Sequence, residues 1–414
     1  MEFIKYMDFS ANTLFIAAIT IILTVLAYFF IISVFGWRKR PESREDSYPD
    51  KNYAIIVAAH NEQSVIGNTI RSIKAMNYPE EKYGIFVIAD NCTDDTANIA
   101  RACGAAVFER QDTSNKGKGH ALKWMFDKLF GSDFEFDAVC ILDADNLVSK
   151  DFLLQINKKM KKGYQVVQGY RDMKNPWDSW ITSSYSITYW LANRLCQLPR
   201  QYLGMNCTLT GSGYAVSVET LKKIGWEIET LTEDVEFYFQ LCLNDVKIGW
   251  AHDAVIFDEQ PVTLSQSWRQ RTRWMQGHFS CAFLYGRRVF GKLLRDRSLQ
   301  AFDTAVMLFY PFLYVMGSLL MAFQAMRTII FQIDDTNLKA LLLFVVMSII
   351  TFVAQNIFSV TVLVNEKKAS KNLIMGLVVL PIFNFTWIPI MIQGYFSRKN
   401  KNWAHIAHTS AARL

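Results

Sequence analysis

The stretch AVCILDADNLVSKDF, residues 138–152, places two carboxylates directly after an apolar run. Residues 139–142 have the composition of a strand buried on both faces, and Asp143 and Asp145 follow at its end. Open α/β sheets bind ligands at the carboxyl ends of their strands, and two carboxylates flanking one residue suit a divalent cation and a phosphate. Alternatively, Asp145 or the residue after it could cap a following helix.

Three other apolar runs are also followed by polar groups. YAIIVAAH carries Ala59 at its end and Glu62 just beyond it, and YGIFVIAD ends in Asp90. AAVFER leads into NKGKGHA, where glycines permit a close backbone approach and Lys118 offers a cation to a phosphate. Polar groups therefore follow four successive predicted strands. This pattern predicts a site for a nucleotide whose phosphates need a metal ion.

Short apolar runs alternate with amphipathic helical stretches through this region, which predicts a mostly parallel sheet covered on both faces. Strands are expected at 53–60, 83–90, 105–110 and 138–145, and helices at 62–76, 93–103 and 119–130. The parallel order would bring the polar groups to one edge of the sheet.

The composition limits the class of protein. The 414 residues are 51% hydrophobic and 14% aromatic, which is high for a soluble protein. The net charge of +6 (44 Lys+Arg less 38 Asp+Glu) comes without a long basic stripe carrying interleaved aromatics, so no nucleic-acid partner is expected. The seven cysteines are scattered without a C-x-x-C pair, which argues against a disulfide framework or a zinc site and fits a reducing compartment.

Four apolar segments are long enough to cross a bilayer core of roughly 30 Å: residues 13–35, 304–326, 338–364 and 373–396. Lys339 is the single charged residue within them. The basic segments WRKRPESRE, GRRVFGKLLRDR and NEKKASK all fall on one side if the first span runs from outside to inside. We therefore expect a multi-pass protein of the cell membrane with a cytoplasmic central region. Four spans would place the basic tail SRKNKNWAHIAHTSAARL outside, against the same rule, unless one span is missed or re-entrant.

Two segments beyond the strand pattern carry further chemistry. ETLTEDVEFYFQLCLND predicts a helix that starts near Thr232, where Thr232, Glu233 and Asp234 could form a capping device. SQSWRQRTRWMQGHF, residues 265–279, could be a basic amphipathic helix on the cytoplasmic leaflet. CTLTGSGYAVS, residues 207–217, carries two glycines around Ser212 and is interpreted as a turn in an acceptor pocket.

The motifs AAHNE, IADNCTDDTA, GKGHAL, ILDADN, LTED and QRTRW stand in the order typical of one family. From Tyr53 to about Gly277 the chain resembles the membrane-embedded family 2 glycosyltransferases, a group that includes cellulose, chitin, hyaluronan and poly-N-acetylglucosamine synthases. The resemblance implies an α/β GT-A cytoplasmic domain with a Rossmann-like mixed sheet, joined to an α-helical transmembrane region. It also implies an inverting enzyme that uses a UDP-sugar donor with Mg²⁺ or Mn²⁺.

The resemblance assigns roles to individual residues. Asp145 is expected to ligate the metal, and Asp143 lies near the nucleoside or contributes as a second ligand. Asp234 is the expected general base within the catalytic group Thr232, Glu233 and Asp234. The substrate-binding residues are expected to be Ala59, Glu62, Asp90, Lys118, Asp143, Gln270, Arg271, Arg273 and Trp274, with Arg273 on the diphosphate and Trp274 stacked on the acceptor sugar.

The expected organisation is a transmembrane helix (1–36), a GT-A domain (50–262), interface helices (263–300), channel helices (301–397) and a tail (398–414). The leading hypothesis is a processive synthase that extends a growing β-linked polysaccharide and extrudes it across the lipid bilayer, with a β-glucan from UDP-glucose as the favoured product. An N-acetylglucosamine polymer is the alternative product, and a single transfer to a lipid acceptor is the alternative reaction. A nucleotide-binding transporter subunit would belong to another class and would tolerate Asp234→Asn.

Overall fold

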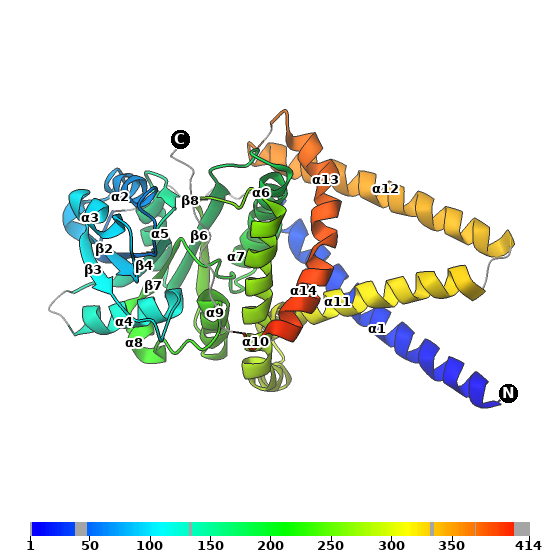
Figure 1. The fold of residues 1–414 in the computed structure, drawn as a ribbon. Coiled ribbons are helices and arrows are strands. Elements are labelled where there is room, and N and C mark those ends of the chain that lie inside the picture. The colour runs from blue at the N-terminus through cyan, green and yellow to red at the C-terminus, as the bar shows by residue number, and fades with distance from the viewer. Residues whose placement is uncertain (1, 38–47, 132–134, 332–334, 369, 401–414) are drawn as a thin grey trace.

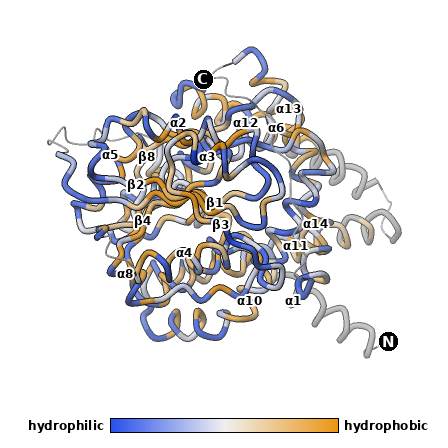
Figure 2. The backbone as a smooth tube through the Cα atoms, turned by 60° about the vertical axis from the view of Figure 1, so that its left-hand side comes forward, coloured by the Kyte–Doolittle hydropathy of each residue, from blue (hydrophilic) through white to orange (hydrophobic). Residues whose placement is uncertain are grey.

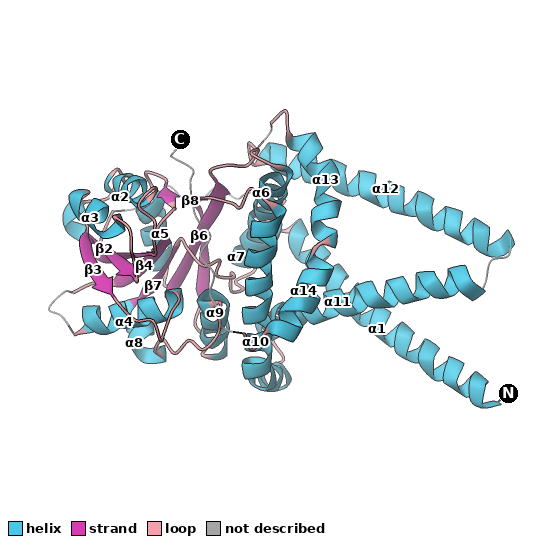
Figure 3. Ribbon diagram, viewed as in Figure 1, coloured by secondary structure: helices cyan, strands magenta, loops and turns pink. Residues whose placement is uncertain are grey.

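The structure is a computed structural model, and it describes residues 2–37, 48–131, 135–331, 335–368 and 370–400 (Figure 1). Most of the tail, with its tryptophan and two histidines, therefore lies outside the described residues. A sheet domain carries one group of helices along one side, and long helices project away from it (Figure 3).

One eight-stranded sheet has the order β3-β2-β1-β4-β7-β6-β8-β5. The strands β3, β2, β1 and β4 are parallel, β7 runs antiparallel to both β4 and β6, and β5 runs antiparallel to β8. The sheet is therefore mixed, with a parallel half that matches the predicted strands. The strands are β1 Tyr53–Ala59, β2 Tyr83–Asp90, β3 Ala106–Arg110, β4 Ala138–Asp143, β5 Leu147–Val148, β6 Val166–Met173, β7 Tyr214–Ser217 and β8 Ile248–Asp258.

The central strands are buried on both faces because helices cover each side of the sheet. Ile56 and Ile141 lie on the face covered by α4, α6 and α9, and Ile55 and Cys140 lie on the face covered by α2, α3 and α5. Figure 2 shows the hydrophobic residues gathered along β1, β2 and β4. This burial explains the unbroken apolar runs in the sequence.

The helices around the sheet follow the predicted order, and α10 is one long helix through the QRTRW motif. The α-helices of this part are α2 Ile66–Lys74, α3 Thr96–Ala102, α4 Lys118–Phe130, α5 Phe152–Lys161, α6 Trp180–Ala192, α7 Leu198–Tyr202, α8 Val218–Ile224, α9 Glu233–Leu243 and α10 Leu264–Asp296. A 3-10 turn η1 (Glu80–Lys82) precedes β2, and a π-helical turn η2 (Asn193–Gln197) joins α6 to α7.

Five helices make up the predicted membrane region: α1 Glu2–Val34, α11 Leu299–Phe331, α12 Asp335–Asn365, α13 Leu373–Phe385 and α14 Trp387–Ser397. Among the described residues, Ala17–Val34, Leu299–Leu320 and Leu373–Ser397 are long and apolar enough to cross a membrane. In Figure 1, α1, α11 and α12 project from the sheet domain, whereas α13 and α14 run alongside α10. The last predicted span is thus two helices joined at Thr386, packed against α6 and α10.

Candidate active site

The Asp-Ala-Asp pair lies where the sequence places it, at the end of β4. In the register of the sheet Asp143 pairs with Ala58 of β1, and Ala59 pairs with Ala89 of β2, so three predicted strand ends lie side by side. The helix-cap alternative is wrong, because α5 begins at Phe152 with Asp151 in the cap position. The two carboxylates are therefore available for another role.

Asp145 is only 4% exposed, and its Oδ2 accepts a hydrogen bond from the backbone N–H of Glu259 at 3.1 Å. Asn146 fixes the same turn, since its Oδ1 accepts from the backbone N–H of Asp143 at 3.1 Å and its Nδ2 donates to Asp258 at 3.0 Å. A buried carboxylate held by a backbone amide is rigid, as a metal ligand should be.

Lys118 joins the donor side of the site to the helix that carries the predicted base. Its Nζ donates to Asp143 Oδ1 at 2.5 Å and to the carbonyl of Gly211 at 2.5 Å, and lies 3.6 Å from Glu233 Oε1. Burial opposes the charge, but Asp143 and Glu233 raise the pKa of Lys118 above its ordinary value. The ammonium is therefore positive at neutral pH and sits between carboxylates from two elements.

Glu233 and Asp234 occupy the first turn of α9, as predicted. Burial raises the pKa of Glu233 to about 7, with Lys118 opposing and Asp234 reinforcing the shift. Burial also raises the pKa of Asp234, although Lys118, Arg171 and Arg273 oppose that shift. A carboxylate with a raised pKa is a stronger base than an ordinary aspartate, which suits proton removal from a hydroxyl.

Thr232 occupies the cap position of α9, but its side chain makes no capping hydrogen bond to the helix. Its Oγ1 faces Gly277 of α10 so closely that a methyl group at Gly277 would lie 2.1 Å away. The capping interpretation is therefore wrong for the Thr232 side chain, which instead packs α9 against α10. In the structure the Thr232 side chain therefore contacts α10, directly before Glu233 and the predicted base Asp234.

Asp90 and Glu62 lie at the ends of the neighbouring strands. Asp90 is 8% exposed and accepts from Arg110 Nη1 at 2.6 Å, while burial raises its pKa against the effect of that arginine. The backbone N–H of Glu62 donates to Thr96 Oγ1 at 2.8 Å, and the Cys92 thiol donates to the carbonyl of Ala59 at 3.5 Å. Sequence reasoning missed Arg110, the last residue of β3, although its position at a strand end was a usable signal.

The QRTRW segment divides into two parts. Arg273 reaches the loop before α9, where its Nη1 donates to the carbonyl of Leu231 at 3.4 Å. Gln270 accepts from Tyr185 Oη at 3.0 Å, and the Trp274 ring stands edge-on to the Tyr185 ring at 6.1 Å. Arg273 therefore lies near the start of α9, and Gln270 and Trp274 connect α10 to α6 through Tyr185.

Arg271 lies elsewhere. It is fully buried, its Nη1 donates to Thr386 Oγ1 at 2.8 Å, and its guanidinium lies over the rings of Phe383 and Trp387 at 4.2 and 4.9 Å. The structure does not bring Arg271 to the carboxylate cluster, because α10 turns this side chain toward the junction of α13 and α14. A packing role fits it better than the predicted contact with substrate.

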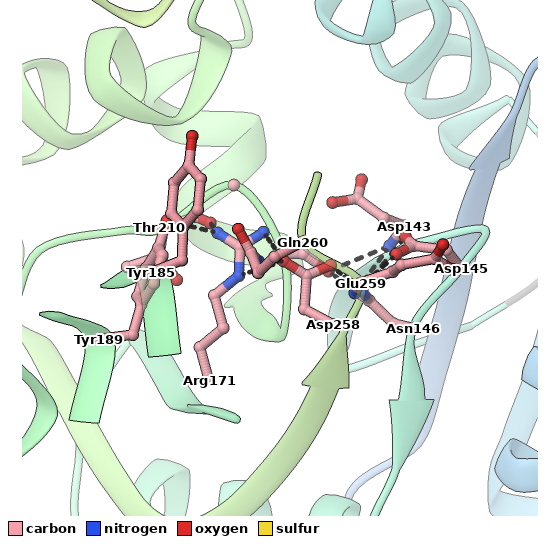
Figure 4. Close-up of polar contacts among 12 residues, drawn as sticks. Asp143, Asp145, Asn146, Arg171, Tyr185, Tyr189, Thr210, Asp258, Glu259 and Gln260 are labelled. Carbon is pink, nitrogen blue, oxygen red and sulfur yellow. Dashed lines mark hydrogen bonds and ion pairs between the residues drawn. The ribbon is translucent and has the colours of Figure 1, made fainter. Parts of the chain in front are cut away.

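The sequence did not single out Arg171 of β6, which lies between the two halves of the site (Figure 4). Its Nε donates to Asp258 Oδ2 at 2.8 Å, its Nη1 donates to the carbonyl of Thr210 at 2.6 Å, and its guanidinium lies 5.1 Å from the Tyr189 ring centre. Arg171 and Asp258 belong to no motif and lie in strands that the sequence analysis did not assign, so only the fold reveals their contact.

The donor set fits a magnesium or manganese ion. No group of three or more His, Cys, Asp or Glu side chains gathers in a metal-binding arrangement within the ranges that the structure describes. Mg²⁺ bound by nucleotide enzymes uses one or two carboxylates and takes its other ligands from phosphates and water. Asp145 matches that pattern, whereas Asp143 is already paired with Lys118 and is the weaker candidate ligand.

Comparison with known proteins agrees with this geometry. The chain is 26% identical over 410 residues to the probable glycosyltransferase YdaM of Bacillus subtilis, covering 93% of each chain. It is 27% identical over 281 residues to the β-monoglucosyldiacylglycerol synthase of Nostoc sp., covering 65% of this chain and 57% of that relative.

The mannosyltransferase PcManGT from Pyrobaculum calidifontis, solved with GDP-Man and Mn²⁺, is similar in structure. The TM-score is 0.62 at 17% identity, over 93% of this chain and 98% of that one. At this identity the likeness shows the fold, and the GT-A prediction is confirmed. The family model described as "Glycosyltransferase like family 2" matches residues 49–277, more than half of the chain. The chain therefore belongs to the family 2 glycosyltransferases.

Proposed function

We propose that this enzyme transfers a hexose, most simply glucose, from a UDP-sugar to a hydroxyl group with inversion of the anomeric centre. Asp234 takes the proton of the acceptor hydroxyl as its oxygen attacks the anomeric carbon. The bond from that carbon to the diphosphate breaks, and UDP leaves with the electron pair. The observation that carries this proposal is the cluster of Lys118, Asp143, Glu233 and Asp234 beside the buried Asp145.

The donor would lie across the ends of β1, β2 and β4. Asp90, held by Arg110, is placed to accept hydrogen bonds from a nucleoside, and Lys118 and Arg273 supply positive charge near the diphosphate. Asp145 would hold Mg²⁺ or Mn²⁺, which when bound neutralises charge on the departing diphosphate. A direct displacement needs one base and no covalent intermediate, which agrees with inversion.

The acceptor side favours a sugar hydroxyl. Trp274 is only partly buried and stands edge-on to the buried Tyr185 ring, and Gln270 is hydrogen-bonded to the Tyr185 hydroxyl beside it. Aromatic rings flanked by hydrogen-bonding groups suit the alternating apolar and polar surfaces of a saccharide. We therefore propose a growing β-linked polysaccharide as the acceptor, and extrusion of it by residues 301–397 stays a prediction.

A lipid acceptor is the second candidate, and the position of α13 and α14 favours it. Exposed apolar side chains gather on α13, among them Ile374, Val378 and Phe385. This surface adjoins Arg271 and the QRTRW helix, so a membrane lipid lying against it would come close to the acceptor side. The similarity to a glucolipid synthase agrees with this alternative.

We also propose a membrane arrangement in which α1, α11 and α12 cross the bilayer. Each of these three helices contacts the sheet domain at its nearer end. Gly36, just after α1, lies against the carbonyl of Arg194. Asp303 of α11 forms an ion pair with Arg200, and Glu366, just after α12, forms one with Arg194.

The α13–α14 pair contacts the sheet side at both of its ends, through Gly376 against Ile187 and through Ser397, whose carbonyl accepts from Gln276. We propose that the pair lies in the plane of the cytoplasmic leaflet. This arrangement leaves Arg398 and Lys399 on the cytoplasmic side, where basic residues next to membrane segments are usually found.

The test is incubation of the detergent-purified chain with Mn²⁺ and each radiolabelled UDP-sugar, followed by separation of products by size. Label in material digested by linkage-specific hydrolases supports the polysaccharide, and label in one chloroform-soluble glycolipid supports the lipid. Absence of transfer from every UDP-sugar, to either class of acceptor, would refute the proposed function.

A further inference from the structure

Arg171 has two sets of partners that belong to different halves of the site. Its Nε and Nη2 contact Asp258 Oδ2 at 2.8 and 2.5 Å, and its Nη1 donates to the carbonyl of Thr210 at 2.6 Å and to the Tyr189 hydroxyl at 3.4 Å. The side chain is 12% exposed, so most of these contacts are sheltered from water. Charge-assisted hydrogen bonds in such a setting hold their geometry firmly.

On the first side, Asp258 continues the chain of contacts to the metal-binding turn. Its Oδ1 accepts from Asn146 Nδ2 at 3.0 Å, and Asn146 Oδ1 accepts from the backbone N–H of Asp143. The residue after Asp258 donates its backbone N–H to Asp145 Oδ2. Asp258 and the residue after it therefore fix the position of Asp145, the proposed metal ligand, and Arg171 fixes the position of Asp258.

On the second side, Thr210 begins the loop TGSG, residues 210–213, and each residue of this loop is held. Arg171 binds the first carbonyl, Lys118 donates to the carbonyl of Gly211, and Gln168 donates to the carbonyl of Ser212 at 2.9 Å. Gly211 has a φ of +83°, and a methyl group there would lie 3.4 Å from Asp234 Oδ2. The loop therefore forms the surface that faces the base.

We propose that Arg171 is a positioning residue that sets the distance between the metal-bound donor and the base, by clamping Asp258 and the loop 210–213 together. The inference rests on the proposed function, because it assigns Asp145 to the donor metal and Asp234 to the acceptor proton. Arg171 reaches neither reacting atom itself.

The proposed positioning role depends on the planar, branched shape of the guanidinium group. Arginine presents several N–H donors in a fixed plane and can hold a carboxylate and a carbonyl at the same time. The ammonium of a lysine carries the same charge on a flexible stem without that plane. Arg171→Lys therefore keeps the charge and removes the geometry, and Arg171→Gln removes both.

The experiment measures kcat and KM for the UDP-sugar that the wild-type chain turns over, together with Mn²⁺-dependent UDP binding. Both variants are expected to lose kcat by about 100-fold, the typical effect of a misplacement near 1 Å, with KM and UDP binding changed less than about threefold. Arg194→Gln is the matched control, because Arg194 is a similarly sheltered arginine whose partners, Glu366 and the carbonyl of Trp37, are not members of the carboxylate cluster. It should keep the wild-type kcat.

Near wild-type kcat in Arg171→Lys would overturn the clamp and leave only a charge effect. A loss confined to KM would overturn it as well, since the residue would then serve binding of the donor. A variant counts as folded if its thermal unfolding and its UDP binding match those of the wild type. If Arg171→Gln does not fold, the kcat of Arg171→Lys alone tests the proposal. Inactive wild-type protein would instead refute the proposed function.

Discussion

Replacing Gly277 by alanine should separate catalysis from stability. Gly277 lies on α10 where that helix meets the start of α9, and a methyl group there would lie 2.1 Å from Thr232 Oγ1 and 2.6 Å from its Cγ2. Such contacts must open by about 1 Å before the van der Waals overlap is relieved. The residues displaced are the two that follow Thr232, Glu233 and the predicted base Asp234.

The two energetic effects of Gly277→Ala oppose each other. Overpacking costs about 1–3 kcal/mol, and alanine in a helix interior is more favourable than glycine by about 0.8–1 kcal/mol, so the net loss of stability should be about 0–2 kcal/mol. A shift of about 1 Å in a catalytic group lowers the rate by about 100-fold. The enzyme should therefore remain folded and lose most of its turnover.

The assay pairs kcat with thermal unfolding of the detergent-purified protein. Gly291→Ala is the matched control, since Gly291 lies on the same helix with nothing within 4 Å of the added methyl group. It should retain full activity and gain about 1 kcal/mol of stability. If Gly277→Ala keeps a kcat within threefold of wild type, the α9–α10 contact does not position the base.

Three further predictions concern the donor site, the buried acid pair and the helix junction. Arg110→Gln should raise KM for the UDP-sugar about 10-fold or more with a smaller change in kcat, because Asp90 loses the partner that orients it, and a kcat-only effect would contradict this. Glu233 has a folded pKa of about 7 against an ordinary value of 4.5, so folding favours its protonated form. That contribution to stability is complete below about pH 4.5 and is lost as the pH rises through 7, and Glu233→Gln should therefore raise the unfolding temperature at pH 8 while lowering activity. Arg271→Met should leave UDP binding unchanged and speed proteolysis near Thr386, since the guanidinium no longer holds the α13–α14 junction.

The parallel half of the sheet could be predicted because its signals are local. The strands at 53–59 and 138–143 are buried on both faces and read as unbroken apolar runs, and Asp90 and Asp143 mark where such runs end. The other half was not assigned, since β7 has only four residues and β8 carries a histidine and an aspartate in its middle. Pairing between residues far apart in sequence determines those strands.

The positions of the polar groups at strand ends were predictable for the same reason, whereas the supporting contacts were not. Asp145 and Asp234 belong to motifs, but Arg171, Asp258 and Arg110 gain their meaning only from neighbours brought by the fold. Arg271 shares a motif with Arg273 but points to another side of α10. A motif fixes the order of side chains, and the helix determines which way each one faces.

Composition does not distinguish two arrangements of the last predicted span. Residues 373–396 are apolar enough to cross a bilayer, but they pack as two helices along α6 and α10, joined at Thr386. Their length and hydropathy are the same in either arrangement. The basic residues that follow them favour the in-plane arrangement proposed above.

The most direct test of the account is transfer from a radiolabelled UDP-sugar by wild-type protein, Asp145→Asn and Asp234→Asn, each measured with Mn²⁺ and with excess chelator. The account predicts that wild-type transfer stops on chelation and that Asp234→Asn binds UDP with Mn²⁺ normally but transfers at least 1,000-fold more slowly, roughly the upper range for loss of a general base. Asp145→Asn should lose the dependence of UDP binding on Mn²⁺. Undiminished transfer by Asp234→Asn, or by wild-type protein without a divalent metal, would contradict it.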